Sequence, residues 1–358
     1  MPKNLQKNRS LKIGKFNFKK GKTFIVAELS GNHNGSFNRA KKLLIKAKES
    51  GADAVKLQTF SADLITLNSK KNDFKLDYLN NKEWKRYKTF YSLYSKSSTP
   101  WDWHPKLFDL AKKIGIEIFS SPFDETAVDF LEKLKCVAYK IASPEITHIP
   151  LITKVAKTKK PVIISTGLAS LEDLDLAINT LRKNGCKKLF ILKCNSSYPA
   201  PIIESNLKNI QFLKNKYNLP IGLSDHTIGD NSAVVAVSLG AKIVEKHFNL
   251  KDNLTTVDSF FSSNQNDFQL MVDKIRITEK TLGNYEYTIS KSSKKNFASR
   301  RSIFISKNIR KNERITKDNI KVVRPSFGLH PKFFLKVLGK KVNKSLKHGE
   351  RLKIKYLK

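Results

Sequence analysis

Eight short runs rich in β-branched and other apolar residues recur along the chain, and their spacing constrains the fold most strongly. They occupy residues 23–28, 53–58, 116–121, 136–141, 161–165, 188–193, 220–224 and 241–247. Between most of them, apolar residues recur at intervals of three and four, as in residues 36–51 and 171–185, which is typical of amphipathic helices. Eight alternating strand and helix units predict a (β/α)8 TIM barrel in the α/β class, with a doubly wound open sheet as the alternative.

A second, smaller domain is predicted after the barrel, because 358 residues are many for one core. Residues 284–300 are polar and irregular, and we interpret them as a linker. Residues 301–358 contain several short apolar runs, which favour a compact, mostly β module with short helices. The barrel is thus expected to span residues 1–283. The long stretch 59–115 is rich in aromatic residues and predicts an ordered lid or subunit contact.

The cysteines and the N-terminal segment predict a cytoplasmic protein without a membrane partner. The three cysteines form no Cys-x-x-Cys pair, which argues against a disulfide framework. Residues 1–22 are basic but contain no apolar stretch typical of a secretory signal. No run approaches the roughly 18 apolar residues of a membrane-spanning helix.

The net charge of +37 is concentrated at the two ends of the chain. Residues 1–22 carry eight Lys/Arg and no acidic residue, and residues 291–358 carry 22 Lys/Arg against three acidic residues. A tail of this kind is compatible with binding to nucleic acid or to an anionic envelope surface, which is the non-enzymatic alternative. Its lysines are dispersed among apolar residues without an Arg-rich cluster, so a solvated face is favoured and no nucleic-acid partner is expected.

Polar residues lie in or just after every predicted strand. In a (β/α)8 barrel the catalytic residues lie at the carboxyl ends of the strands, so this pattern predicts an active-site face. The residues concerned are Glu28, Lys56, Gln58, Ser120, Ser121, Lys140, Ser143, Glu145, Ser165, Ser196, Tyr198, Ser224, Asp225, His226, Glu245 and His247.

Lys56 and Lys140 lie inside predicted strands, where a buried ammonium group is costly without an anion. They therefore suit a phosphate or carboxylate ligand. Two alternatives remain open: a Schiff-base lysine, as in an aldolase that uses Lys140, and a structural ion pair with a glutamate of the barrel.

Two histidines end adjacent predicted strands, His226 in "GLSDHT" and His247 in "EKHF". A single histidine there would most simply be a hydrogen-bonded core residue. A pair on neighbouring strands can bind one divalent metal through neutral imidazole nitrogens, so the pair predicts a metal site.

Several motifs together resemble one enzyme family from about residue 20 to the end of the chain. They include "AELSGNHNG", "GADAVKLQTF", "SSPFDETAVDFLE", "YKIASPEI", "KCNSSYP", "GLSDHT", "EKHF", "DSFFS" and, in the tail, "RRSIF" and "VVRPSFGLHP". The sequence resembles the sialic acid synthase family of phosphoenolpyruvate-dependent nonulosonate synthases. Leu29-Ser30, "TPWDWH" and "SFGLHP" are similar to the pseudaminic acid synthase branch, whereas the sialic and legionaminic branches more typically have Ile-Gly after the glutamate.

The resemblance implies a barrel followed by a small antifreeze-like (SAF) domain, assembled as a domain-swapped homodimer. It also implies a metal-assisted condensation of phosphoenolpyruvate with an amino sugar and water, which releases phosphate by C–O cleavage. For the pseudaminic branch the sugar is 2,4-diacetamido-2,4,6-trideoxy-altrose. N-acetylmannosamine or the legionaminate precursor is the alternative substrate.

The resemblance also implies roles for individual residues. His226 and His247 would hold Mn²⁺ or Mg²⁺. Phosphoenolpyruvate would be held by Lys56, Lys140, Ser143, Ser165, Ser196 and Ser224. The sugar and the reacting centre would be faced by Glu28, Gln58, Glu145, Tyr198 and Asp258, of which Glu28, Gln58, Glu145 and Asp258 would be catalytic. Arg324 of the partner chain would reach the acyl group of the sugar.

Overall fold

The computed structural model describes residues 11–18, 21–77, 79, 81–284 and 286–358. The chain divides into two compact units, Met1–Gly283 and Asn284–Lys358, which are described separately below. The first ten residues, part of the basic stretch that the sequence distinguishes from a secretory signal, lie outside the described residues.

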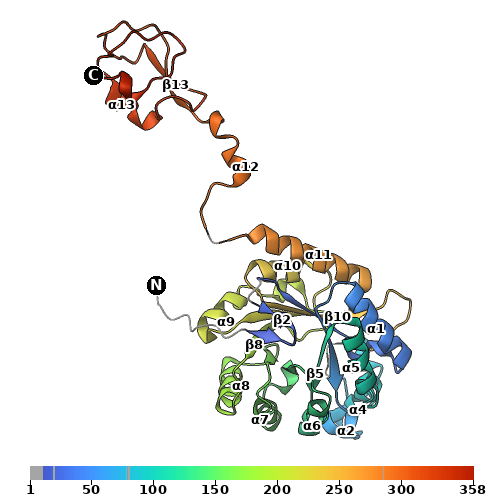
Figure 1. The fold of residues 1–358 in the computed structure, drawn as a ribbon. Helices are drawn as coiled ribbons and strands as arrows, with labels where there is room; N and C mark the ends of the chain where they lie inside the picture. The colour runs from blue at the N-terminus through green and yellow to red at the C-terminus, as the bar shows by residue number, and fades with distance from the viewer. Residues whose placement is uncertain (1–10, 19–20, 78, 80, 285) are drawn as a thin grey trace. The chain divides into compact units, whose positions relative to one another are not determined.

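The first unit is a closed barrel of eight parallel strands (Figure 1). Each predicted run overlaps one of them, and β10 pairs with both β9 and β3, which closes the sheet. The barrel prediction is therefore confirmed and the open-sheet alternative is wrong. The strands are β3 (Phe24–Glu28), β4 (Ala54–Thr59), β5 (Glu117–Pro122), β6 (Tyr139–Ile141), β7 (Val162–Ser165), β8 (Leu189–Cys194), β9 (Ile221–Asp225) and β10 (Ile243–Asn249).

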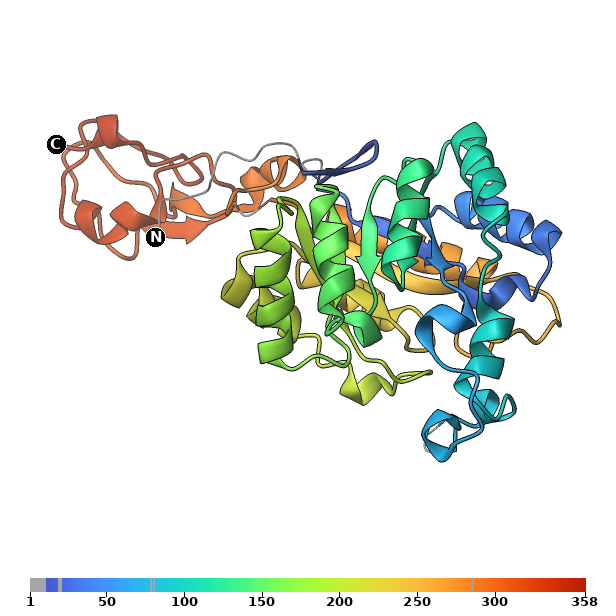
Figure 2. The same cartoon turned by 90° about the horizontal axis from the view of Figure 1, so that it is seen from below.

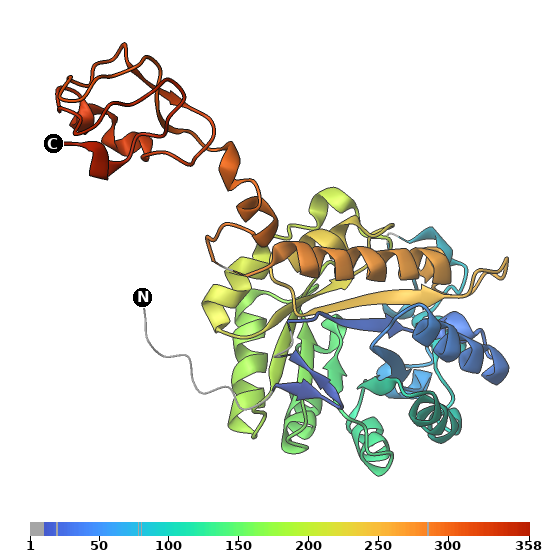
Figure 3. The same cartoon turned by 45° about the horizontal axis from the view of Figure 1, so that its top comes forward.

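Helices surround the barrel, and several of them begin at a side chain that caps them. Ser36 accepts a hydrogen bond from the backbone of Arg39 at the start of α1, and Ser170 and Asp173 form a capping box at the start of α8. The last helix of this unit, α11, packs against α10 (Figure 3). The main helices are α1 (Phe37–Glu49), α5 (Trp103–Ile114), α6 (Glu125–Lys133), α7 (Ile149–Lys157), α8 (Leu171–Lys183), α9 (Asn209–Tyr217), α10 (Asn231–Ser238) and α11 (Gln265–Leu282).

A hairpin that the sequence did not predict packs against the amino-terminal side of the barrel strands. Its strands are β1 (Lys12–Ile13) and β2 (Phe16–Asn17). The ring of Phe16 lies 4.7 Å from that of Phe24 at the start of β3, and the ring of Phe18 lies 4.9 Å from that of Phe190 on β8. These aromatic contacts cover one end of the barrel with apolar side chains, whereas the carboxyl ends of the strands lie at the other end.

The described residues of the long stretch between β4 and β5 fold at the end of the barrel away from the hairpin (Figure 2). It contains α2 (Ala62–Ile65), α3 (Lys82–Lys85) and α4 (Phe90–Ser97) before α5. Leu76 and Leu93 from this stretch form a small apolar cluster with Val257, which follows β10. The described part of this stretch is thus packed against the loop that follows the last barrel strand, and its role as a lid or subunit contact stays a prediction.

The second unit has its own apolar core and little regular sheet. Its strands β12 (Ser302–Ile305) and β13 (Ile320–Val323) are antiparallel, and isolated bridges link further extended segments. Short helices α12 (Lys291–Lys294) and α13 (Phe334–Val337) complete the unit. The core is made of Ile303, Ile305, Ile309, Ile315, Ile320, Val337, Val342, Leu346 and Leu352. Across the part of the chain that the structure describes, no helix is both long and apolar enough to span a bilayer.

Substituting Gly222 on β9 tests how tightly the barrel interior is packed. A methyl group there would lie 2.5 Å from the backbone oxygen of Ile243 and 2.6 Å from Leu192 Cδ2. Because the close neighbour is backbone, we expect Gly222→Ala to lower the free energy of unfolding by about 1–3 kcal/mol in urea titrations. Gly115→Asn is the control, because Gly115 has a left-handed φ of +72° and open space around it. Equal stability of the two variants would contradict the packing argument.

Candidate active site

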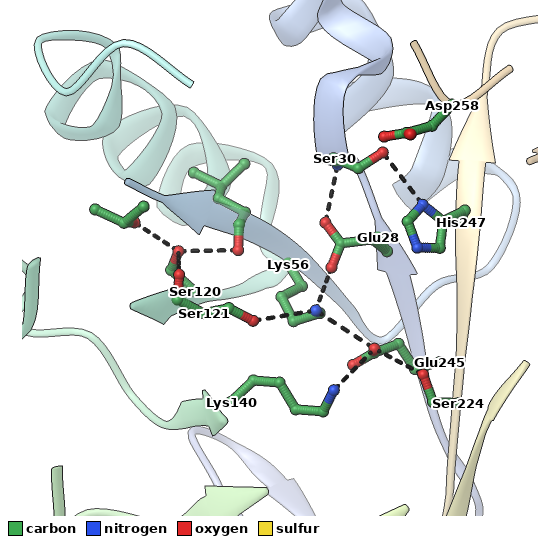
Figure 4. A network of polar contacts seen from close by, with 12 residues as sticks. Glu28, Ser30, Lys56, Ser120, Ser121, Lys140, Ser224, Glu245, His247 and Asp258 are labelled. Carbon is green, nitrogen blue, oxygen red and sulfur yellow. Dashed lines mark hydrogen bonds and ion pairs between the residues drawn. The ribbon is translucent and has the colours of Figure 1, made fainter. Parts of the chain in front are cut away.

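Four buried charged side chains, here called the charge cluster, meet near the carboxyl ends of the barrel strands (Figure 4). Glu28 on β3 and Lys56 on β4 form an ion pair. Glu245 Oε1 on β10 lies 3.4 Å from Lys56 Nζ and 3.3 Å from Lys140 Nζ on β6. Ser224 Oγ donates to the same oxygen at 3.2 Å. Both lysines therefore pair with a barrel glutamate, the arrangement that the sequence left open as a structural alternative.

The surroundings of the charge cluster shift the pKa of each member. Burial raises the pKa of Glu28, and Lys56 opposes this rise. Burial would lower the pKa of Lys56, but Glu245 and Glu28 raise it above its usual value. Burial lowers the pKa of Lys140, and Lys56 adds to the effect while Glu245 opposes it. Burial would raise the pKa of Glu245, but Lys140 and Lys56 hold it at about 2. Lys140 is thus the lysine whose positive charge is less well compensated.

Three buried polar atoms beside the charge cluster have no hydrogen-bond partner. They are Glu145 Oε2, Ser165 Oγ and Glu245 Oε2, from a set of seven such atoms among the described residues. Buried polar atoms in folded proteins are normally hydrogen-bonded. These atoms indicate a site that can bind a ligand carrying both donors and acceptors.

Ser143 and Ser196 approach each other at a glycine. Ser143 Oγ accepts a hydrogen bond from the backbone N–H of Leu168 at 2.6 Å. A methyl group on Gly167 would collide with Ser196 Oγ and would lie 2.9 Å from Ser143 Oγ. The loop after β7 therefore needs glycine at residue 167 to bring these two hydroxyl groups together.

The rings of His226 and His247 lie close together, with centroids 5.4 Å apart. His226 Nδ1 lies 2.7 Å from the backbone oxygen of Asn195, which requires a proton on Nδ1. His247 Nδ1 lies 3.2 Å from Ser30 Oγ. Since these contacts use Nδ1 of both rings, Nε2 of each is the nitrogen left for a ligand, and the Nδ1 contacts orient the rings.

The two imidazoles fit a divalent metal only as part of an open coordination shell. Within the described ranges, no group of three or more His, Cys, Asp and Glu residues is placed to hold a metal ion. Burial and the neighbouring His226 hold the pKa of His247 well below its ordinary value, so that ring is neutral, as metal ligation requires. Such a donor set suits an ion that keeps several positions for substrate oxygens and water.

Asp258 and Tyr198 lie at the histidine side of the site. Asp258 Oδ2 accepts a hydrogen bond from the backbone N–H of Gly31 at 3.2 Å, and burial raises the pKa of Asp258. The Tyr198 ring lies 4.3 Å from the His226 ring. Both residues come from loops that follow strands, β10 and β8 respectively, so the barrel brings them together.

The remaining predicted residues are not members of the charge cluster. Gln58 is half-buried on β4, paired in register with Ser121 of β5. Arg324 is exposed in the second unit. Asp225, which the sequence placed among the polar residues at a strand end, pairs instead with the buried Lys246 at 2.7 Å.

Sequence reasoning assigned no role to several residues that shape this site. Ser30 has an unusual φ of +40°, donates its N–H to Glu28 Oε1 at 2.8 Å and contacts His247. Ser121 Oγ accepts from Lys56 Nζ at 3.2 Å. Trp84 and Phe261 pack around Tyr198. The polar ends of the first and third strands could have indicated the two serines, but no local signal places the aromatic residues.

Comparison with known families agrees with this geometry. The model of the NeuB family matches residues 43–287, which include seven of the eight barrel strands, and the SAF domain matches residues 300–355. The chain belongs to the NeuB family.

Relatives of this NeuB-family chain include two pseudaminic acid synthases. One, from Campylobacter jejuni, is 44% identical over 96% of this chain and 98% of its own length. The other, from Helicobacter pylori, is 45% identical over 90% of this chain and 94% of its own. An N,N'-diacetyllegionaminic acid synthase from Campylobacter jejuni is 38% identical over 93% of this chain and 99% of its own length. Among solved structures, the spore coat polysaccharide biosynthesis protein SpsE of Bacillus subtilis is 32% identical, with a TM-score of 0.64 over 98% of this chain and 99% of that one.

The charge cluster predicts different costs for removing its two lysines. Lys56 contacts two carboxylates and Ser121, whereas Lys140 contacts Glu245, which Lys56 also neutralises. Lys56→Met leaves Glu28 buried without a cation, so we expect it to lower the free energy of unfolding by about 3–5 kcal/mol. Lys140→Met should cost less. Urea unfolding of the two variants at one pH measures the difference, and a larger cost for Lys140→Met would contradict the pairing.

Glu145 predicts a pH dependence of stability. Burial raises its pKa to about 7, so the folded protein keeps a proton that the unfolded chain releases near pH 4.5. Stability from this group is therefore lost as the pH rises from about 4.5 to about 7. Glu145→Gln removes the titration, so its melting temperature relative to the wild type should be higher at pH 8 than at pH 5. The exposed Glu49→Gln is the control, and parallel pH profiles for wild type and Glu145→Gln would refute the assignment.

Proposed function

We propose that this chain is a pseudaminic acid synthase. It condenses phosphoenolpyruvate with 2,4-diacetamido-2,4,6-trideoxy-altrose and water to give pseudaminic acid and phosphate. The observation that carries the proposal is the set of partnerless buried polar atoms around Lys56 and Lys140, beside two imidazoles with free Nε2 atoms. Lys56 and Lys140 form the charged half of the site, which suits an anionic substrate. His226 and His247 form the histidine half, which suits an oxygen-rich substrate.

The charged half suits phosphoenolpyruvate. Lys140 makes a single ion pair and keeps N–H groups for a phosphate or carboxylate oxygen. Ser165 Oγ has no partner among the described residues, and Ser143 and Ser196 present hydroxyl groups at Gly167. Because these groups donate hydrogen bonds to an anion, no Schiff base on Lys140 is needed.

The histidine half suits the aldehyde of the open-chain sugar. His226 and His247 would hold Mn²⁺ or Mg²⁺ through Nε2. A divalent ion bound there supplies Lewis-acid polarisation of the aldehyde oxygen. Ser30 and the Asn195 carbonyl hold the two rings in orientation from behind.

The reaction needs a nucleophilic carbon, a proton donor and a water molecule. Carbon 3 of phosphoenolpyruvate forms a bond to the aldehyde carbon, water adds to carbon 2, and phosphate leaves as the C2–O bond breaks. Glu145, with a pKa of about 7, can hold or release a proton at neutral pH. Glu28 and Asp258 supply further buried carboxylates, which would stabilise the cationic centre that develops at carbon 2, and Gln58 lies half-buried at the strand end.

The assembly and the compartment are part of the same proposal. Arg324 lies in the SAF unit, and we propose that it acts on the sugar bound by the partner chain in a domain-swapped homodimer. The three cysteines are free and buried, in keeping with a reducing cytoplasm.

A phosphate-release assay tests the proposed reaction and its sugar. With Mn²⁺ and phosphoenolpyruvate, we expect phosphate to appear with 2,4-diacetamido-2,4,6-trideoxy-altrose and at least tenfold more slowly with N-acetylmannosamine. The 38% identity to a legionaminic acid synthase, against 44% to a pseudaminic acid synthase, makes the altrose sugar the first choice. His226→Ala should abolish turnover, whereas the exposed His348→Ala should not. A preference for N-acetylmannosamine would reject the sugar assignment, and pyruvate trapped on Lys140 by borohydride would reject the mechanism.

A further inference from the structure

Four aromatic side chains form a wall at the histidine side of the site. This aromatic wall consists of Trp84, Tyr198, Phe260 and Phe261. The Trp84 ring lies 5.1 Å from the Tyr198 ring and meets Phe260 and Phe261 edge to face at 6.0 and 6.2 Å. The Phe261 ring in turn lies 4.6 Å from the His247 ring. The wall is therefore continuous from Trp84 to both imidazoles.

Trp84 belongs to the stretch between β4 and β5, and polar contacts fix it in the wall. Its backbone N–H donates to Asn81 Oδ1 at 3.0 Å, and its indole N–H donates to the backbone oxygen of Val257 at 3.0 Å. Asn81 Nδ2 also donates to the backbone oxygen of Tyr198 at 2.9 Å. The Trp84 ring thus forms part of the wall. Its one polar hydrogen is bonded to Val257, in the loop that also carries Asp258.

The polarity of the site changes from one side to the other. The lysines and carboxylates of the charge cluster pair with one another, whereas the two imidazoles contact the aromatic wall at Tyr198 and Phe261. If phosphoenolpyruvate occupies the lysine side and the sugar aldehyde lies at the imidazoles, the far end of the sugar meets the wall. This step depends on the function proposed above.

We propose that Trp84 is a specificity-determining residue that selects a sugar whose far end carries a methyl group instead of a hydroxymethyl group. The ring offers apolar surface, and its N–H is already bonded to Val257. A hydroxyl group held against the rings of Trp84, Phe260 and Phe261, which offer it no donor or acceptor, would lose its hydrogen bonds to water without replacement. Discrimination of this kind reaches about a hundredfold, because an apolar pocket rejects an added hydroxyl group only moderately.

The test compares kcat/KM for 2,4-diacetamido-2,4,6-trideoxy-altrose with that for its 6-hydroxy analogue. The wild type should prefer the deoxy sugar by about tenfold to a hundredfold. Trp84→Ala should lower this ratio at least tenfold and leave the KM for phosphoenolpyruvate within about twofold. Trp84→Phe, which keeps an aromatic ring, should lower the ratio less and serves if Trp84→Ala does not fold. An unchanged ratio in both variants overturns the assignment. So does an equal rise in the KM for the deoxy sugar and in the KM for phosphoenolpyruvate.

Trp101→Phe is the matched control, because Trp101 lies in the same stretch but stacks on Phe130 of α6 at 4.8 Å. It should keep the wild-type ratio.

A binding measurement supports the kinetics. The chain has three tryptophans, so the double variant Trp101→Phe/Trp103→Phe keeps Trp84 as its one tryptophan, and its fluorescence should change when the deoxy sugar is added. An absent change contradicts a contact at Trp84. A wild type that does not turn over the deoxy sugar rejects the proposed function and this inference together, whereas normal turnover with an unaffected ratio rejects only the inference.

Discussion

The site depends on charges held inside a closed ring of strands. Glu28, Lys56, Lys140 and Glu245 come from four strands, and each is nearly inaccessible to solvent. Buried charges are tolerated only when they are paired, so the barrel must hold these strands in register for the cluster to form. Lys56 pairs with two carboxylates, whereas Lys140 pairs with one. Because every charge has a partner, the cluster is stable without a ligand, and because Lys140 has a single partner, it can also bind an anion.

The barrel interior is layered by polarity, which explains why the chemistry is confined to one end. Phenylalanines of β1–β2 and of the first barrel strand cover the amino-terminal side. Above them lies a tightly packed layer in which Gly222 leaves no room for a methyl group. The charge cluster and His247 follow at the carboxyl ends of the strands (Figure 4), and His226 and the aromatic wall lie against His247. We therefore expect a polar substrate to enter from the loop side, where the stretch between β4 and β5 supplies Trp84.

Most of the barrel could be predicted from the sequence, because all eight strands are short apolar runs separated by helical periodicity. The hairpin β1–β2 could not, because Lys12 to Asn17 is too short and too basic to resemble a strand pair. Lys56, Lys140 and the two histidines could be predicted because they interrupt apolar runs. Trp84 could not, because its neighbours Tyr198 and Phe261 lie more than a hundred residues away in sequence. Its role depends on long-range packing that leaves no local pattern.

The most direct test of this account is the equilibrium affinity for phosphoenolpyruvate measured by calorimetry, without sugar, on the wild type and on Lys140→Met. If Lys140 is the cation held ready for the anion, the variant should bind about tenfold to a hundredfold more weakly, which is the range expected for a lost hydrogen bond to a charged group. Equal affinity in a folded variant would show that the lysine of β6 serves only to neutralise Glu245, and the anion site would then lie elsewhere.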